Sequence, residues 1–186
     1  MKISLKEPGV VCAVALSSAL AAPPCTATAH ASGPRPASRC ETDTAQAVAA
    51  QLQRAPDGRL TSPDTLSYGG GAEVIAFRPP SCAAARRNTE RDCDEDGVLD
   101  NAVCLYDRRA FEGSRQAIKA TGTRRLNGSI AIMSIKNDRP FIFLVKKTPA
   151  ERGTCFSPGE GYGNTGQVAG QRWVDAHPSL RECGAL

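Results

Sequence analysis

The stretch CLYDRRAFEG, residues 104–113, carries an aromatic ring at Tyr106, a second ring at Phe111 after four intervening residues, and a glycine at position 113. Gly113 can adopt the positive φ that a tightly folded hairpin needs, because glycine has no Cβ that would clash. An aromatic ring can cover the backbone that the missing side chain leaves open. The stretch therefore predicts two short strands, at 103–107 and 115–119, joined by a folded hairpin.

Further short strands separated by turns are predicted towards the C-terminus, at residues 130–135, 141–146 and 167–174. Asn127 and Gly128 both tolerate a positive φ, so they predict a hairpin turn before the first of these strands. The same two residues begin an Asn-Gly-Ser sequon, which matters only in a glycosylating host. Helical periodicity is weak in this part of the chain, which indicates one β-rich domain.

The region before this domain differs, because apolar residues recur there at helical spacing. We expect one short amphipathic helix with Asp43 or Thr44 as its N-cap, and its apolar face consists of Ala45, Val48, Ala49 and Leu52. The sequence Pro56-Asp57-Gly58 ends this helix, and a Gly-rich turn then leads into a strand at 73–77. The residues thus predict a mostly β protein with an N-terminal helix-strand extension.

The first 31 residues have the pattern of a secretory signal. Lys2 and Lys6 precede an apolar run at 10–22, and Ala29-His30-Ala31 supplies small residues around a cleavage point. The run of about thirteen apolar residues is too short for a membrane anchor, which needs roughly 20. A lipoprotein signal at Cys25 is an alternative, but the two prolines before this cysteine do not fit that processing. We expect a secreted, extracellular protein with a signal at 1–31, a linker and helix-strand extension at 32–90, and a main domain with a C-terminal tail at 91–186.

Six cysteines remain after the signal, and an even number in an exported chain predicts three disulfides. Sequence alone allows fifteen pairings of six cysteines. The separation of Cys93 and Cys104 suits a local bridge, and with that pair formed the bridges Cys40–Cys82 and Cys155–Cys183 would follow. A zinc site is the weaker alternative, because the chain has no CxxC spacing.

Charge and catalytic inventory exclude several classes of function. Removing the signal lowers the basic residues from 23 to 21 and the acidic residues from 19 to 18, which leaves about +3. A charge this small and evenly interleaved does not form the clustered basic face that nucleic acids need, and we expect no membrane partner either. His177, next to Pro178, is the only histidine after the signal, so a Ser/His/Asp triad would rest on that one residue. We therefore expect a protein that is not an enzyme.

The acidic stretch DCDEDGVLDNAV, residues 92–103, places four carboxylates at positions 1, 3, 5 and 9 of a twelve-residue calcium loop, with Gly97 at position 6 for the sharp turn. These candidate metal ligands are Asp92, Asp94, Asp96 and Asp100. Position 12 is Val103 instead of a glutamate, and no flanking helices are expected, so the stretch is not an EF-hand. It is similar to the calcium loops of thrombospondin type 3 repeats. The alternative is a solvated acidic turn clamped by Cys93 and Cys104.

The motif formed by Tyr106, Phe111 and Gly113 resembles the Greek-key signature of βγ-crystallin domains. Together with the following stretch LNGSIAIMSIKND, residues 93–168 are similar to the actinobacterial peptidase inhibitors with a crystallin-like fold, the family of the secreted Streptomyces metalloproteinase inhibitor. Residues 48–77 resemble the N-terminal extension found before this domain in many members. The long acidic loop stands where that family has a short CPxGxxC hairpin. The resemblance implies a disulfide-stapled, crystallin-like Greek-key β-sandwich.

The same resemblance implies a function and a site. The stretch GTCFSPGEGYGNTGQVAG, residues 153–170, is similar to the family's reactive loop, so the bond presented to a protease would be Cys155-Phe156. Phe156 would fill an apolar pocket of a thermolysin-like protease, with the carbonyl of Cys155 near the catalytic zinc. The family loop closes with a second cysteine a few residues on, which this chain lacks. Cys155 as a structural bridge and Phe156 as a core residue is the competing interpretation.

Two functions follow from these observations. The first is a secreted inhibitor, acting as a monomer, of an extracellular metalloprotease or subtilisin-like protease. The second is a secreted crystallin-like module, structural or calcium-binding, without inhibitory activity. The crystallin type of calcium site is not expected around Asn127, because the paired acidic and hydroxyl residues are missing there. A second Greek-key motif would need its spacing repeated near Phe156 and Tyr162, and that spacing is one residue too long.

Overall fold

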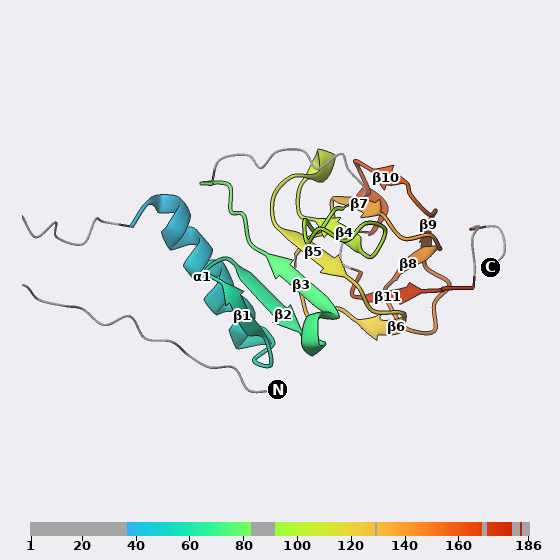
Figure 1. Ribbon diagram of the computed structural model, residues 1–186, viewed down its shortest axis with the longest axis horizontal. Coiled ribbons are helices and arrows are strands. Elements are labelled where there is room, and N and C mark those ends of the chain that lie inside the picture. The colour runs from blue at the N-terminus through green and yellow to red at the C-terminus, as the bar shows by residue number, and fades with distance from the viewer. Residues whose placement is uncertain (1–36, 83–91, 129, 169–170, 180–182, 184–186) are drawn as a thin grey trace, which may run out of the picture. The chain divides into compact units, whose positions relative to one another are not determined.

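The computed structural model describes residues 37–82, 92–128, 130–168, 171–179 and 183. The predicted signal at 1–31 lies outside the described residues, and so do residues 83–90 of a linker that the sequence predicts at 82–90 from its Ala and Arg content. The described chain is mostly β, with one helix and two antiparallel sheets (Figure 1). Three disulfides join Cys40 to Cys82, Cys93 to Cys104 and Cys155 to Cys183, the pairs favoured from the sequence.

The helix α1, Arg39–Arg54, begins earlier than the sequence analysis expected. Its N-cap is Ser38, whose hydroxyl accepts from the backbone N–H of Glu41 at 3.2 Å, while the Glu41 carboxylate accepts from the Ser38 N–H at 2.6 Å. This reciprocal pair satisfies two N–H groups that the first turn would otherwise leave unbonded, so Asp43 and Thr44 lie inside the helix. The buried face of α1 packs on the neighbouring strands through a cluster containing Val48, Leu66, Tyr68, Ile75 and Phe77.

Seven strands form the first sheet, in the order β1-β2-β3-β5-β4-β7-β10, and four form the second, in the order β6-β11-β8-β9. The strands of the first sheet are β1 Arg59–Ser62, β2 Thr65–Tyr68, β3 Glu73–Ala76, β4 Val103–Tyr106, β5 Arg115–Ile118, β7 Ser134–Asn137 and β10 Gly161–Tyr162. Those of the second are β6 Gly122–Arg125, β8 Phe143–Lys146, β9 Thr154–Phe156 and β11 Trp173–Ala176. The predicted extension therefore continues the first sheet, because β3 pairs with β5.

Two successive groups of four strands, β4 to β7 and β8 to β11, exchange their third members between the sheets. Strand β6 of the first group pairs with β11 of the second, and β10 of the second group pairs with β7 of the first. Each sheet thus contains three strands of one group and one strand of the other (Figure 1). The exchange makes the two groups one folding unit, since neither sheet is complete without both.

A folded hairpin connects the first two strands of each group, and each hairpin contains a glycine that makes its bend possible. Gly113 has a φ of 84°, and a Cβ there would lie 1.9 Å from Asp107 Oδ1. Gly153 has a φ of 77°, and a Cβ there would lie 2.7 Å from the carbonyl oxygen of Val145. The second hairpin thus lies between Lys146 and Gly153. A second Greek-key motif was looked for near Phe156 and Tyr162, which is further along the chain.

The main core lies between the two sheets. Fully buried apolar side chains from both sheets meet there, among them Val103, Leu105 and Ile135 from the first sheet and Phe143, Val145, Phe156 and Val174 from the second. Burial of each such side chain contributes about 1.5–3 kcal/mol relative to exposure. In β4 these residues alternate with Cys104 and Tyr106, which point to the opposite face of the sheet and are buried in a second cluster with Cys93.

The strands predicted at 73–77, 103–107, 115–119 and 141–146 are confirmed, each shortened at an end. The strand predicted at 130–135 has the wrong bounds, because the paired segment is Ser134–Asn137. The strand predicted at 167–174 also has the wrong bounds, because the paired segment is Trp173–Ala176. The missed strands β1, β2, β6, β9 and β10 are only two to four residues long, and none is a continuous apolar run.

Asn127 and Gly128 do not form the predicted hairpin turn, because the buried carboxylate of Glu73 holds them. This carboxylate accepts from the backbone N–H groups of Asn127 at 3.0 Å and Gly128 at 2.9 Å, from Asn127 Nδ2 at 3.0 Å, and from Gln116 Nε2 at 2.6 Å. Four donors compensate the cost of burying the group. These hydrogen bonds connect the extension to the segment between β6 and β7.

Candidate functional site

The acidic loop, defined as residues 92–104, is closed by the Cys93–Cys104 disulfide and leads into β4. The carboxylate of Asp92 accepts from the backbone N–H of Asp96 at 3.2 Å and of Gly97 at 2.9 Å. The carboxylate of Asp96 accepts from the N–H of Val98 at 2.8 Å and from Asn101 Nδ2 at 3.1 Å. The loop therefore carries its own hydrogen-bond scaffold.

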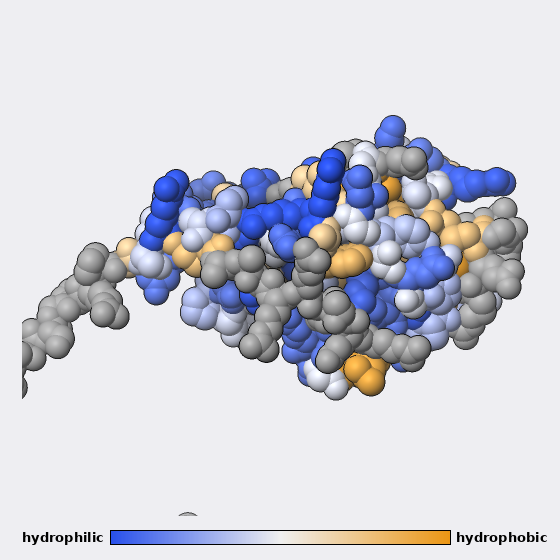
Figure 2. All heavy atoms as spheres, turned by 90° about the horizontal axis from the view of Figure 1, so that it is seen from above, coloured by the Kyte–Doolittle hydropathy of each residue, from blue (hydrophilic) through white to orange (hydrophobic). Residues whose placement is uncertain are grey.

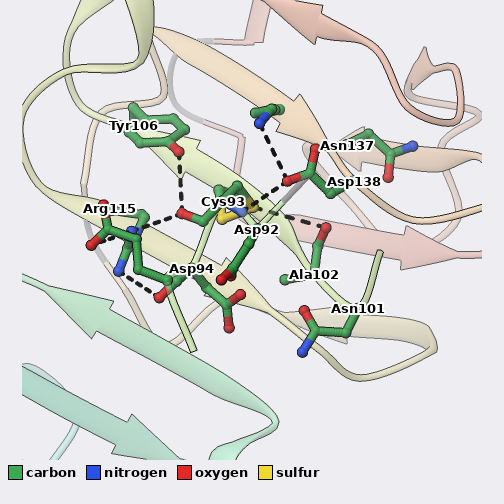
Figure 3. The surroundings of a disulfide bond; sticks show 12 residues. Asp92, Cys93, Asp94, Asn101, Ala102, Tyr106, Arg115, Asn137 and Asp138 are labelled. Atoms are coloured by element: carbon green, nitrogen blue, oxygen red, sulfur yellow. Dashed lines mark hydrogen bonds and ion pairs between the residues drawn. A yellow bond between two sulfur atoms is a disulfide. The ribbon is translucent and has the colours of Figure 1, made fainter. Parts of the chain in front are cut away.

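Contacts from β5 and from the residues that follow β7 fix the base of the loop (Figure 3). Arg115, on β5, donates to the carbonyl of Cys93 at 2.7 Å and of Asp94 at 2.8 Å. The Asp138 carboxylate accepts from the Cys93 N–H at 2.8 Å, and Arg139 Nε donates to the carbonyl of Asn101 at 3.1 Å. Charged groups that satisfy backbone atoms in this way are stronger partners than neutral ones.

Three of the four predicted metal ligands come together. One carboxylate oxygen each of Asp92, Asp94 and Asp96 lies within 4.8 Å of the others. Asp100 is not in this group: it has a φ of 56° and lines a separate cavity of about 240 Å³ with Asp138 and Arg139. The backbone turn at Asp100 directs it away, so the predicted four-ligand set is wrong at this position.

A lysine that the sequence analysis did not consider occupies one side of this group. Lys119 Nζ contacts Asp94 Oδ2 at 2.5 Å and also contacts Asp96 Oδ2. Burial opposes protonation of Lys119, but its hydrogen bonds to Asp94 and Asp96 raise its pKa above the ordinary value. Burial raises the pKa of Asp94, whereas the hydrogen bond from Lys119 lowers the pKa of Asp96.

The outer part of the acidic loop presents two adjacent apolar side chains to solvent. Val98 is 54% exposed and Leu99 is 61% exposed, and the only other large apolar side chain as exposed among the described residues is Leu60, at 55%. The view in Figure 2 shows a mainly hydrophilic face with small separate hydrophobic areas. Positive φ values at Gly97 and Asp100 turn the backbone on both sides of the apolar pair.

The predicted reactive bond, Cys155-Phe156, lies in a different environment. Cys155 pairs with Leu144 of β8, and the Phe156 side chain is only 3% exposed and packs in the main core against the ring of Tyr162, with ring centroids 4.9 Å apart. Asn137 Nδ2 also donates to the Phe156 carbonyl at 3.2 Å. The expectation that Phe156 is presented to a protease is therefore wrong, because strand pairing turns its ring inward.

Tyr106, Phe111 and His177, which the sequence also singled out, each have a defined packing or hydrogen-bond partner. Tyr106 and Phe111 pack at 5.8 Å between ring centroids in a T-shaped arrangement beside the hairpin of Gly113. His177 Nε2 lies 3.0 Å from Asp175 Oδ2, and that oxygen also pairs with Lys146 Nζ at 2.8 Å. His177 and Lys146 are thus both hydrogen-bond partners of the Asp175 carboxylate. None of the helices in the described residues is long and apolar enough to cross a membrane.

Comparison with known proteins found no protein family, no curated protein and no solved structure that matches this chain.

Proposed function

We propose that the protein is an exported peptidase inhibitor that presents the acidic loop to an extracellular metalloprotease or subtilisin-like protease. The fold supports the family resemblance on which this proposal rests. Two four-strand groups that exchange their third strands, each opened by a folded hairpin around a glycine, are what a pair of crystallin-like Greek keys requires. We also propose that the two sheets form a crystallin-like Greek-key β-sandwich.

The observation that carries the proposal is the exposed pair Val98-Leu99 on a loop that is held at many points. A disulfide, two carboxylates within the loop and two arginines outside it fix the backbone on either side of the pair. A segment that is already held in its bound conformation loses little conformational entropy when it binds, so less of the interaction free energy is offset by ordering the loop. Proteases of both classes have subsites that accept an aliphatic side chain, and Leu99 is the more exposed of the two.

Exposure decides between the two candidate segments. The apolar residue beside Cys155 is in the core, whereas the apolar residues inside the Cys93–Cys104 loop face solvent. A substrate-like contact needs side chains that can leave the inhibitor surface and enter a pocket. Exposure therefore supports the acidic loop as the proposed protease contact.

The experiment compares inhibition of a thermolysin-like and a subtilisin-like protease by the oxidised protein and three variants. Leu99→Ala and Val98→Ala remove side chains from the proposed contact, and Leu60→Ala removes an equally exposed side chain on β1 as the matched control. Interface anchors typically contribute about 2–4 kcal/mol, so we expect at least one loop variant to weaken inhibition by roughly 30- to 1,000-fold. Leu60→Ala should inhibit like the unaltered protein.

Two different failures can be told apart in this experiment. If the unaltered protein inhibits neither protease, the inhibitor function is wrong and a crystallin-like binding or structural module without inhibitory activity takes its place. If it inhibits and both loop variants match Leu60→Ala, the inhibitor function stands and the assignment of the acidic loop is wrong.

A further inference from the structure

The base of the acidic loop brings three carboxylates together beside the ammonium group of Lys119. Asp92, Asp94 and Asp96 each direct a carboxylate oxygen to within 4.8 Å of the others. Lys119 contacts Asp94 and Asp96 through one ammonium group. Two of the three carboxylates therefore contact this lysine.

Asp94 shows where charge compensation is incomplete. Its side chain is only 4% exposed, its Oδ2 contacts Lys119, and its Oδ1 is buried without a hydrogen-bond donor. The carboxyl group of Asp92 lies beside it (Figure 3) and offers only acceptor oxygens when ionised. A buried acceptor without a donor is costly, and the cost is larger for a charged group. A bound cation would remove this cost.

We propose that Asp92, Asp94 and Asp96 bind one calcium ion, and that the Lys119 ammonium is the internal cation that calcium replaces. The donor set consists of carboxylate oxygens, which suit a hard cation and not a soft metal. An irregular loop fits the flexible coordination geometry of calcium, while magnesium demands near-ideal octahedral geometry. Calcium binding is a property separate from the proposed inhibition and does not depend on it.

The exchange needs movement of one side chain and no change of the sheet. The backbone N–H of Lys119 donates to the carbonyl of Ala72 at 2.9 Å, so its Cα stays in place when the side chain swings away. The Lys119 side chain is 26% exposed, so solvent already reaches it. A divalent ion brings one more positive charge to the three carboxylates than the lysine does.

The expected affinity is low, because the site is incomplete and already partly neutralised. Calcium takes six to eight oxygen ligands, and three carboxylates leave several positions to water. Lys119 must also give up its ion pairs with Asp94 and Asp96. We expect a Kd on the order of 10⁻⁴ to 10⁻³ M, the range of extracellular calcium modules.

The experiment is calorimetric titration of calcium into the oxidised protein and its variants, with a melting curve of each in chelator and in calcium. Lys119→Met removes the competing cation, and Lys147→Met, at an exposed lysine, is its matched control. We expect Lys119→Met to bind calcium at least about tenfold more tightly than the unaltered protein and to gain more in melting temperature on adding calcium. Lys147→Met should bind like the unaltered protein.

Removal of a ligand gives the opposite result. Asp94→Asn should abolish calcium binding while Asp57→Asn, in an exposed turn, leaves it unchanged, and the melting curves show whether each variant is folded. Absence of binding to the unaltered protein at about 10 mM calcium, well above the expected Kd, would overturn the proposal. So would an affinity in Lys119→Met that equals that of Lys147→Met, or equal affinities for magnesium and calcium.

Discussion

Two segments of this protein pair a disulfide with apolar residues, and they use those residues in opposite ways. In the acidic loop, Val98 and Leu99 face solvent inside the Cys93–Cys104 bridge. In β9, Phe156 follows Cys155 directly and is buried in the core between the sheets. A cysteine close to an apolar residue therefore does not identify a bond that is presented to a protease. The sequence does not distinguish the exposed case from the buried one.

Strand pairing explains the difference. Cys155 lies opposite Leu144 in β8, so the next residue, Phe156, points to the other face of the sheet, which is the core. Residues 92–102 of the acidic loop form no strand. The carboxylates of Asp92 and Asp96 accept hydrogen bonds from its backbone, and Arg115 donates to it. The β9 segment is thus stabilised by apolar burial, and the acidic loop by polar contacts. The following predictions test this contrast.

The largest effect is expected for Phe156→Ala. Removing a ring buried in the main core leaves a cavity and should destabilise the protein by about 3–5 kcal/mol. Urea denaturation followed by circular dichroism measures the change in the free energy of unfolding. A loss below about 1 kcal/mol would contradict the core placement of this ring and restore it as a candidate for protease contact.

A smaller loss is expected when the disulfide of the acidic loop is removed by changing both Cys93 and Cys104 to serine. The bridge joins residues 11 apart in sequence, and loops of this size contribute about 2–3 kcal/mol through the entropy of the unfolded chain. Denaturation of the oxidised protein and the double variant measures it. Protection of the Phe156 amide from hydrogen exchange should persist in the variant under native conditions, because β9 belongs to the other sheet.

Acid should loosen the acidic loop before it affects β9. The hydrogen bond from Lys119 holds the pKa of Asp96 below 3.8, so the stabilisation it provides is present above that value and is lost as the pH falls through the lowered pKa. Burial raises the pKa of Asp94, and its protonation, which comes first, does not disfavour the folded state. Ion pairs of this kind contribute up to about 1 kcal/mol. Protection factors of the Val98 amide should fall as the pH drops below 3.8, while those of the Leu144 amide stay constant.

The smallest effect is expected for Leu99→Ala. An exposed side chain outside any buried contact usually changes stability by less than about 0.5 kcal/mol. The same denaturation experiment as for Phe156→Ala gives the value, so the two variants form a direct pair. A loss comparable to that of Phe156→Ala would mean that Leu99 packs against the protein and is not available to a partner.

Features that depend on local sequence were predictable. The bend at Gly113 needs a residue without a Cβ, and the apolar strands at 103–106 and 143–146 are continuous enough to be recognised. The Ser38 and Glu41 capping box was also visible as a serine followed three residues later by a glutamate, a signal that would have placed the start of α1.

Features that depend on distant contacts were not predictable. Lys119 and Arg115 are ordinary surface-type residues in the sequence, and only the pairing of β5 with β4 brings them to the acidic loop. The second folded hairpin left a faint signal: Ala150-x-x-Gly153-Thr154 repeats Ala110-x-x-Gly113-Ser114 without the aromatic residue between them. The ring of Phe156 turns inward because of its register on β8, which no local pattern encodes.

The pairing of β3 with β5 has a consequence for solubility. Without the N-terminal strands, β5 would be the edge of its sheet, and its unpaired N–H and C=O groups beside Ala117 and Ile118 would be a template for another chain. The extension moves that edge to β1, a four-residue strand that starts with Arg59 and whose register shifts between Leu60 and Ser62. A charged, irregular edge discourages aggregation. We therefore expect removal of the extension to favour pairing of β5 with another chain.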